Sequence, residues 1–120
     1  MSLDPRLADG EYVFCSLPED RAAGLRDFAV CTFREAEGIT LVLPRDVAGA
    51  LQLPCEFPCR LISLGAYTAL DAVGILARIA AALAAAGIPS NAVSAFHHDH
   101  LFVPTADAER ALRLLQTLSL

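Results

Sequence analysis

Potential metal ligands are densest at His97-His98-Asp99-His100. Imidazole nitrogens and carboxylate oxygens are good Zn²⁺ ligands. The segment is typical of a tight β-hairpin, however, and consecutive side chains of a strand point to opposite faces. His98 and His100 would share a face but supply only two ligands, while Asp99 is a common turn residue. We therefore expect no metal site. The cluster is expected instead to shape the hairpin or to contact a ligand or partner.

The four cysteines, Cys15, Cys31, Cys55 and Cys59, do not form a recognisable redox or zinc motif. Cys55 and Cys59 are separated by Glu-Phe-Pro, whereas zinc knuckles and thioredoxin motifs have two intervening residues. Cys15 and Cys31 fall in the middle of predicted strands, where cysteine is most simply a small core residue. We expect four reduced thiols.

No catalytic constellation is evident in the sequence. Ser63, Ser90 and Ser94 are not in a nucleophile-elbow sequence. There is no phosphate-binding loop, dinucleotide fingerprint or paired-carboxylate pattern. We expect no catalytic residues, no cofactor and no enzymatic activity. Turnover, or covalent labelling at a cysteine, would contradict this expectation.

The composition of the 120 residues excludes several function classes. The net charge is −5, and all nine basic residues are scattered arginines, so there is no basic surface for nucleic acid. A hydrophobic content of 55% excludes intrinsic disorder and favours a homo-oligomer, which we expect to be a dimer. No stretch is long enough to span a membrane and no signal peptide is evident, so we expect a cytoplasmic protein.

The clearest element is a helix that follows a turn at residues 71–74. Asp71 is a plausible N-cap, and a stripe of Ile75, Leu76, Ile79 and Leu83 has helical spacing. Gly87 ends the pattern. The remaining positions are almost all alanine, which predicts a helix buried on more than one side.

The second half, residues 59–120, reads as strand, helix, strand, strand, helix. The strands are predicted at 59–67, 91–96 and 100–103, and Thr105 is the expected cap of the last helix. This is the ferredoxin-like order, an α+β fold, without its closing strand. Residues 11–58 read as a degenerate copy, with strands at 11–17, 28–34 and 39–43 and a short helix at 45–51. Residues 1–10 are predicted to be a flexible leader, although an N-terminal strand could also complete the second half's sheet.

The turn, helix and hairpin together resemble a known family. Asp71, Gly74, Ile75 and Leu76 match the strand-to-helix turn of the ACT domain, and Ala86-Gly87-Ile88 match its second strand. The hairpin His98-Asp99-His100-Leu101-Phe102-Val103-Pro104 resembles a subgroup of small stand-alone tandem ACT-like proteins. The resemblance spans about residues 10–118. It implies ferredoxin-like βαββαβ units, each an antiparallel sheet with helices on one face.

The resemblance implies an amino-acid-binding regulatory or sensor module, with the ligand at an interface between ACT-like units. Free N–H groups at a helix N-terminus suit the ligand's carboxylate, and glycine permits close approach. The Asp71 carboxylate could take the ammonium, and Asn91 could bridge either group. The expected binding residues are Asp71, Ala72, Val73, Gly74, Ile75, Asn91, Ala92 and Val93.

Structural roles also explain these residues. Asp71 could be only an N-cap, Gly74 a packing glycine and Asn91 a turn residue. The alternative function is a protein–protein interaction or oligomerisation module with no small ligand. Either function requires a protein partner, whose identity is unknown, and neither involves nucleic acid or a membrane.

Overall fold

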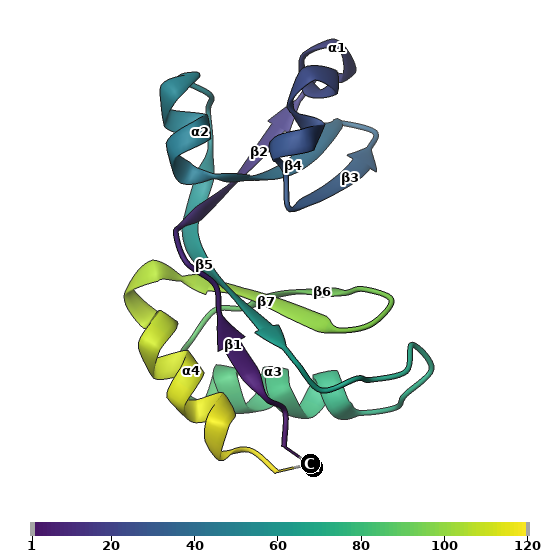
Figure 1. Cartoon of the computed structure of the whole chain (residues 1–120), viewed down its shortest axis with the longest axis vertical. Helices are drawn as coiled ribbons and strands as arrows, with labels where there is room; N and C mark the ends of the chain where they lie inside the picture. The colour runs from purple at the N-terminus through teal and green to yellow at the C-terminus, as the bar shows by residue number, and fades with distance from the viewer. Residues whose placement is uncertain (1, 120) are drawn as a thin grey trace. The chain divides into compact units, whose positions relative to one another are not determined.

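The computed structural model describes residues 2–119, which form two compact units (Figure 1). The N-terminal unit comprises Gly10–Pro58. The C-terminal unit comprises the chain up to Asp9 together with Cys59 onward. Among the described residues, no helix is long and apolar enough to cross a membrane.

The N-terminal unit is a three-stranded antiparallel sheet with short helices. Its strands pair in the order β3-β4-β2. The elements are β2 (Tyr12–Leu17), α1 (Glu19–Ala22), the 3₁₀ helix η1 (Ala23–Phe28), β3 (Cys31–Glu35), β4 (Gly38–Pro44) and α2 (Arg45–Ala50). The strand predicted from residue 28 begins later because the chain first completes η1.

Alternation along the strands builds the core of the N-terminal unit. Val13, Cys15 and Leu17 are buried on β2 while the residues between them are more exposed. The alternate β4 residues Ile39, Leu41 and Leu43 join the same cluster, as do Ala22 of α1 and Ala48 of α2. One face of the sheet therefore carries both helices, each too short for a complete ferredoxin-like layer.

The C-terminal unit is a four-stranded antiparallel sheet with two longer helices. Its strands pair in the order β1-β5-β7-β6. The elements are β1 (Pro5–Leu7), β5 (Glu56–Leu64, in this unit from Cys59), α3 (Ile75–Ala85), β6 (Asn91–Ser94), β7 (Asp99–Pro104), the 3₁₀ helix η2 (Thr105–Asp107) and α4 (Ala108–Thr117). Both helices pack on one face of this sheet (Figure 1).

The first residues of the chain supply the strand that the second half lacks. β1 pairs with β5 through Pro5–Leu64 and Leu7–Ile62, and Leu3 is only 1% exposed in the core of this unit. The predicted flexible leader is therefore wrong. Three residues of strand are too short a pattern to recognise, and they are ordered by pairing with residues almost sixty positions away. The closing strand completes the ferredoxin-like order.

Helix α3 begins later than predicted and is less buried. Its N-cap is Gly74, in the left-handed region at φ 88, with no side-chain cap; Asp71 lies in the preceding turn. The prediction of Asp71 as N-cap is thus wrong. Only Ile79 and Leu83 of α3 are buried, so its alanine-rich side is largely exposed in a single chain.

Candidate functional site

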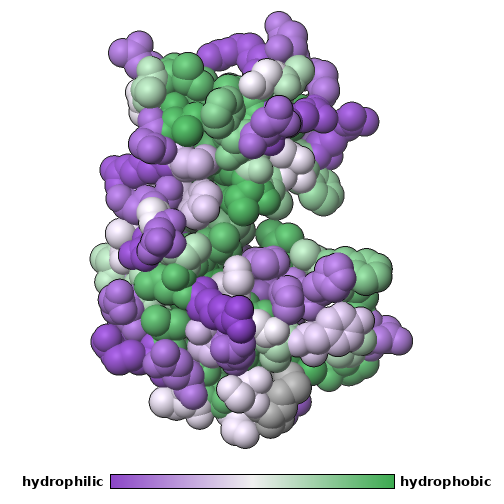
Figure 2. Space-filling model, viewed as in Figure 1, coloured by the Kyte–Doolittle hydropathy of each residue, from purple (hydrophilic) through white to green (hydrophobic). Residues whose placement is uncertain are grey.

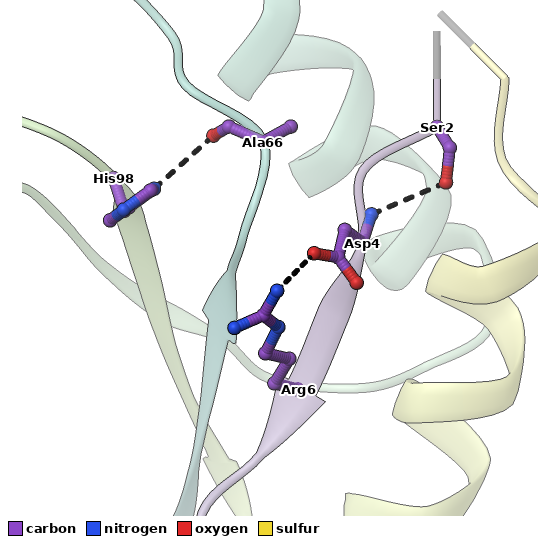
Figure 3. A network of polar contacts seen from close by, with 5 residues as sticks. All are labelled: Ser2, Asp4, Arg6, Ala66 and His98. Carbon is purple, nitrogen blue, oxygen red and sulfur yellow. Dashed lines mark hydrogen bonds and ion pairs between the residues drawn. The ribbon is translucent and has the colours of Figure 1, made fainter.

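The loop between β5 and α3 is held in place by the N-terminal segment. Gly65 donates its backbone N–H to the Asp4 carbonyl at 2.8 Å, and Ala66 donates to the Leu3 carbonyl at 3.2 Å. A Cβ on Gly65 would displace the exposed Asp4 carboxylate and would lie 3.1 Å from the Asp4 carbonyl oxygen, so glycine fits this approach best. The Asp4 carboxylate in turn accepts a hydrogen bond from Arg6 at 2.6 Å (Figure 3).

The hairpin reaches the same loop from the other side. His98 Nδ1 lies 3.4 Å from the Ala66 carbonyl oxygen (Figure 3). The loop and the β6–β7 hairpin lie at one end of the C-terminal unit (Figure 1). The loop is thus fixed near its start by contacts to the residues before β1 and to the hairpin.

A pocket of about 240 Å³ lies where the loop, the first turn of α3 and the hairpin meet. This is slightly below the size range of pockets for drug-sized ligands, so it suits a small metabolite. Its lining residues are Thr68, Ala69, Leu70, Ala72, Ile75, Leu76, Ser94 and Asp99.

The N-terminus of α3 brings hydrogen-bond donors to this pocket. The first bond within the helix is from Arg78 N–H to the Gly74 carbonyl, at 3.1 Å. The N–H groups of Ile75 and Leu76 therefore have no acceptor within the helix, and no side chain caps them. Aligned peptide dipoles give this end a partial positive charge, which favours an anionic group.

Asp99 contributes the opposite charge. It opens β7, pairs with Ser94 across the hairpin, and is only 7% exposed. Within residues 2–119 it is the one buried charged or polar residue, and its charge interacts with the neighbouring His100. A carboxylate that lines a small pocket attracts a cationic ligand group. Thr68 and Ser94 add hydroxyl groups to the lining.

The structure gathers some of the expected binding residues and separates others. Ala72 and Ile75 line the pocket, and Asp71, Val73 and Gly74 belong to the exposed turn beside it. Asn91, Ala92 and Val93 lie on β6, paired with Phe102, Leu101 and His100, and are not lining residues.

Sequence reasoning missed the residues that give the pocket its polarity. Asp99 was interpreted as a turn residue, but β7 begins there, one residue earlier than predicted. In β7, Asp99, Leu101 and Val103 lie on one face of the strand and are all buried, and Phe102 between them is buried too. A carboxylate in phase with a buried hydrophobic series was the signal that could have identified it.

The histidine cluster has structural contacts. Ser63 Oγ and His100 Nδ1, which face each other across β5 and β7, share a hydrogen bond of 2.8 Å. Burial lowers the pKa of His100, the charge of His98 lowers it further, and Asp99 opposes both effects. Among residues 2–119, no group of three or more histidine, cysteine, aspartate or glutamate side chains is placed to hold a metal ion.

Two family models match the chain, and both are described as ACT domain. One matches residues 1–60 and the other residues 55–117. No curated protein matches the chain.

Solved structures resemble the whole chain. A Vibrio cholerae protein of unknown function, described as a possible transport protein, is 36% identical to this chain, with a TM-score of 0.89. The match covers 100% of this chain and 92% of the Vibrio chain. A protein from Agobacterium tumefaciens is 23% identical, with a TM-score of 0.77, and the match covers 96% of this chain and 87% of that protein. The regulatory subunit of aspartate kinase from Thermus flavus is 12% identical, with a TM-score of 0.67, and the match covers 93% of this chain and 94% of that subunit. The last two likenesses concern the fold alone.

Proposed function

The chain belongs to the ACT domain family, with two ACT units in tandem, and we propose that it is a regulatory module that binds a free amino acid. The binding site is the 240 Å³ pocket of the C-terminal unit. The observation that carries the proposal is the pairing, in one pocket, of an uncapped helix N-terminus with the buried Asp99 carboxylate.

These two groups are complementary to the two charges of an amino acid. The ligand's carboxylate accepts hydrogen bonds from the N–H groups of Ile75 and Leu76. Its ammonium pairs with Asp99, with the Ser94 and Thr68 hydroxyls as further partners. Asp71 is exposed on the turn outside the lining, so Asp99 is the better ammonium partner.

The apolar part of the pocket receives the ligand's side chain. Ala69, Leu70, Ala72 and Leu76 offer small and aliphatic surface, which favours a small aliphatic side chain over a charged one. A role for Asn91, Ala92 and Val93 stays a prediction, which the substitution Asn91→Ala tests by its effect on affinity.

The fold relatives support a regulatory role. Regulatory subunits of aspartate kinase share this fold, although at 12% identity they show nothing about the ligand. We expect the ligand to act by stabilising an arrangement of ACT units, which a partner protein then recognises.

Thermal unfolding with each of the twenty amino acids at millimolar concentration tests the proposal. A ligand at one hundred times its Kd adds about 2.7 kcal/mol of stability. For a chain of this length, the melting temperature should rise by several degrees. We expect a rise with one amino acid or a few related ones, and a loss of that rise in Asp99→Asn, which keeps the side-chain shape and removes the charge.

The matched control is Asp71→Asn, which removes a carboxylate from the adjacent exposed turn. If Asp71→Asn abolishes the rise and Asp99→Asn preserves it, the ammonium is bound at the turn, and the proposed orientation is wrong. If no amino acid raises the melting temperature of the folded protein, the amino-acid site itself is refuted.

Exposed apolar residues favour a second candidate function, a protein interaction module. Tyr67, Leu70 and Val73 on the loop and Phe96 on the hairpin are between 62% and 92% exposed. Figure 2 shows apolar surface among hydrophilic residues on both units. Under this function the chain associates through these residues, and no amino acid stabilises it.

A further inference from the structure

A second pocket, of about 430 Å³, lies entirely within the N-terminal unit. It is larger than the proposed amino-acid site and shares no residue with it. Two of the four cysteines of the chain open onto it. The lining residues are Phe14, Cys15, Ser16, Thr40, Pro54, Cys55 and Glu56.

The two cysteines of this pocket differ in environment. Cys15 lies on β2 and is only 3% exposed, and burial raises the pKa of its thiol. The charge of Cys55 raises the pKa of Cys15 further, and both residues line the same pocket. Cys55 lies in the connector between α2 and β5 and is exposed to solvent.

An aromatic contact holds the two cysteine-bearing segments together. Phe14, beside Cys15, packs edge-to-face against Phe57, two residues after Cys55, with ring centroids 5.9 Å apart. Phe57 itself has a positive φ of 59, an uncommon conformation for a phenylalanine that the ring contact helps to hold. The connector therefore stays beside β2 next to Cys15, although the side chains of Phe14 and Cys15 point to opposite faces of the strand.

We propose that Cys15 and Cys55 form a reversible disulfide when the protein meets a peroxide, which makes this pocket a redox modification site. Cys55 is the residue that reacts first, because its sulfur is accessible. Its thiolate attacks the O–O bond of hydrogen peroxide, which gives a sulfenic acid and releases hydroxide, and the hydroxide takes up a proton to become water.

Cys15 completes the reaction. Its sulfur attacks the sulfenic sulfur of Cys55, the S–S bond forms, and the sulfenic oxygen leaves as a second water with the proton of Cys15. The two thiols lose two hydrogens and two electrons in total, and the peroxide is reduced to two waters. A dithiol reductant reverses the change.

The other two cysteines, Cys31 and Cys59, do not line this pocket. Cys31 lies on β3, which is separated from β2 by β4, and it pairs with Val42, whose other partner is Phe14. Two strand spacings put Cys31 about 10 Å from β2, which is beyond disulfide reach for Cys15. Cys59 is fully buried, so it cannot react first with a peroxide, and unlike Cys15 it does not line the pocket with Cys55.

Peptide mapping of the full-length protein tests the inference. The reduced protein is exposed to hydrogen peroxide, alkylated and digested with trypsin without reduction. We expect a cross-link between the peptides 7–21 and 46–60, with fragmentation locating it at Cys55 and not at Cys59, and intact mass showing the loss of two hydrogens. Cys55→Ser should abolish the cross-link, and Cys31→Ser is the matched control that keeps it.

Three results would overturn the inference. One is a disulfide between two chains, another is a bond to Cys31 or Cys59, and the third is oxidation of Cys55 to sulfinic acid while Cys15 remains alkylatable after unfolding. Cys55 is exposed, so circular dichroism of Cys55→Ser should match the parent. A folded Cys55→Ser protein that still forms the bond at Cys15 would also refute the assigned roles.

Discussion

At the scale of single residues, the candidate site depends on where charge is placed relative to a helix end. The N-terminus of α3 and the Asp99 carboxylate line one small pocket, and Gly74 marks the point where the helix begins. A Cβ on Gly74 would meet no atom within 4 Å, although its φ of 88 is unfavourable for most side chains. Two substitutions at Gly74 therefore reveal the effect of charge on binding, provided that both side chains have a similar backbone energy at this φ.

Gly74→Asp should weaken amino-acid binding at least tenfold relative to Gly74→Asn. Both side chains tolerate the left-handed region to a similar degree, so the pair differs mainly in one negative charge. That charge opposes the ligand's carboxylate at the helix N-terminus by about 1–2 kcal/mol, and 1.4 kcal/mol is a tenfold change in Kd. Titration calorimetry with the amino acid that raises the melting temperature measures the difference.

Equal affinities for these two variants, both folded, would mean that the ligand's carboxylate is not bound at the start of α3.

At the scale of elements, β1 has two roles. It closes the sheet of the C-terminal unit beside β5, and the residues before it accept hydrogen bonds from Gly65 and Ala66 at the start of the pocket loop. The same short segment therefore supports both the core and the site. This links the stability of the unit to the geometry of the pocket.

Leu3→Ala should destabilise the protein by about 2–5 kcal/mol, since Leu3 is 1% exposed within the core and truncation leaves a cavity. Urea unfolding measures the change in the free energy of unfolding. The control is Leu51→Ala, a half-exposed position of the N-terminal unit, where we expect a change within about 0.5 kcal/mol.

A Leu3→Ala change as small as that of Leu51→Ala would show that the N-terminal segment contributes little to the core. Leu3→Ala should also lower amino-acid affinity if the Leu3 and Asp4 carbonyls position the loop.

At the scale of the whole molecule, a single chain leaves apolar surface without a partner. Most of the alanine-rich side of α3 is exposed, and so are Val73 and Phe96 near the pocket. The sequence predicted a homodimer from its high apolar content, and these exposed residues support that prediction.

Sedimentation velocity should therefore show a dimer at micromolar concentration. Val73→Asp should raise the dimer Kd at least tenfold, because a buried charge without a partner costs more than 1.4 kcal/mol. Phe33→Asp, at an exposed apolar position of the N-terminal unit, is the control that keeps the dimer. A monomer at all concentrations, or a dimer that only Phe33→Asp disrupts, would contradict this assignment.

Local patterns in the sequence were sufficient for most elements of the fold. The alternation in β2 and β4 and the helical stripe of α3 depend on neighbouring residues, so they can be recognised without knowing the rest of the chain. The two ACT units and the α+β fold with antiparallel sheets, as inferred from the turn, helix and hairpin, are confirmed by the family models and the structure.

Only the tertiary structure decided the features that depend on residues far apart in the chain. The first residues were expected to be flexible, and the strand that completes the second sheet could not be located in the sequence, because three residues carry no periodic signal and become a strand only when β5 supplies hydrogen bonds. Asp99 was expected in a turn, because its burial depends on the loop and on α3 folding over it. Cys15 and Cys55 are forty positions apart and meet in one pocket only after β2 and the connector have packed. Spacing along a sequence predicts local geometry. A site, in contrast, forms when segments far apart in the sequence pack together, and their separation along the chain does not predict that packing.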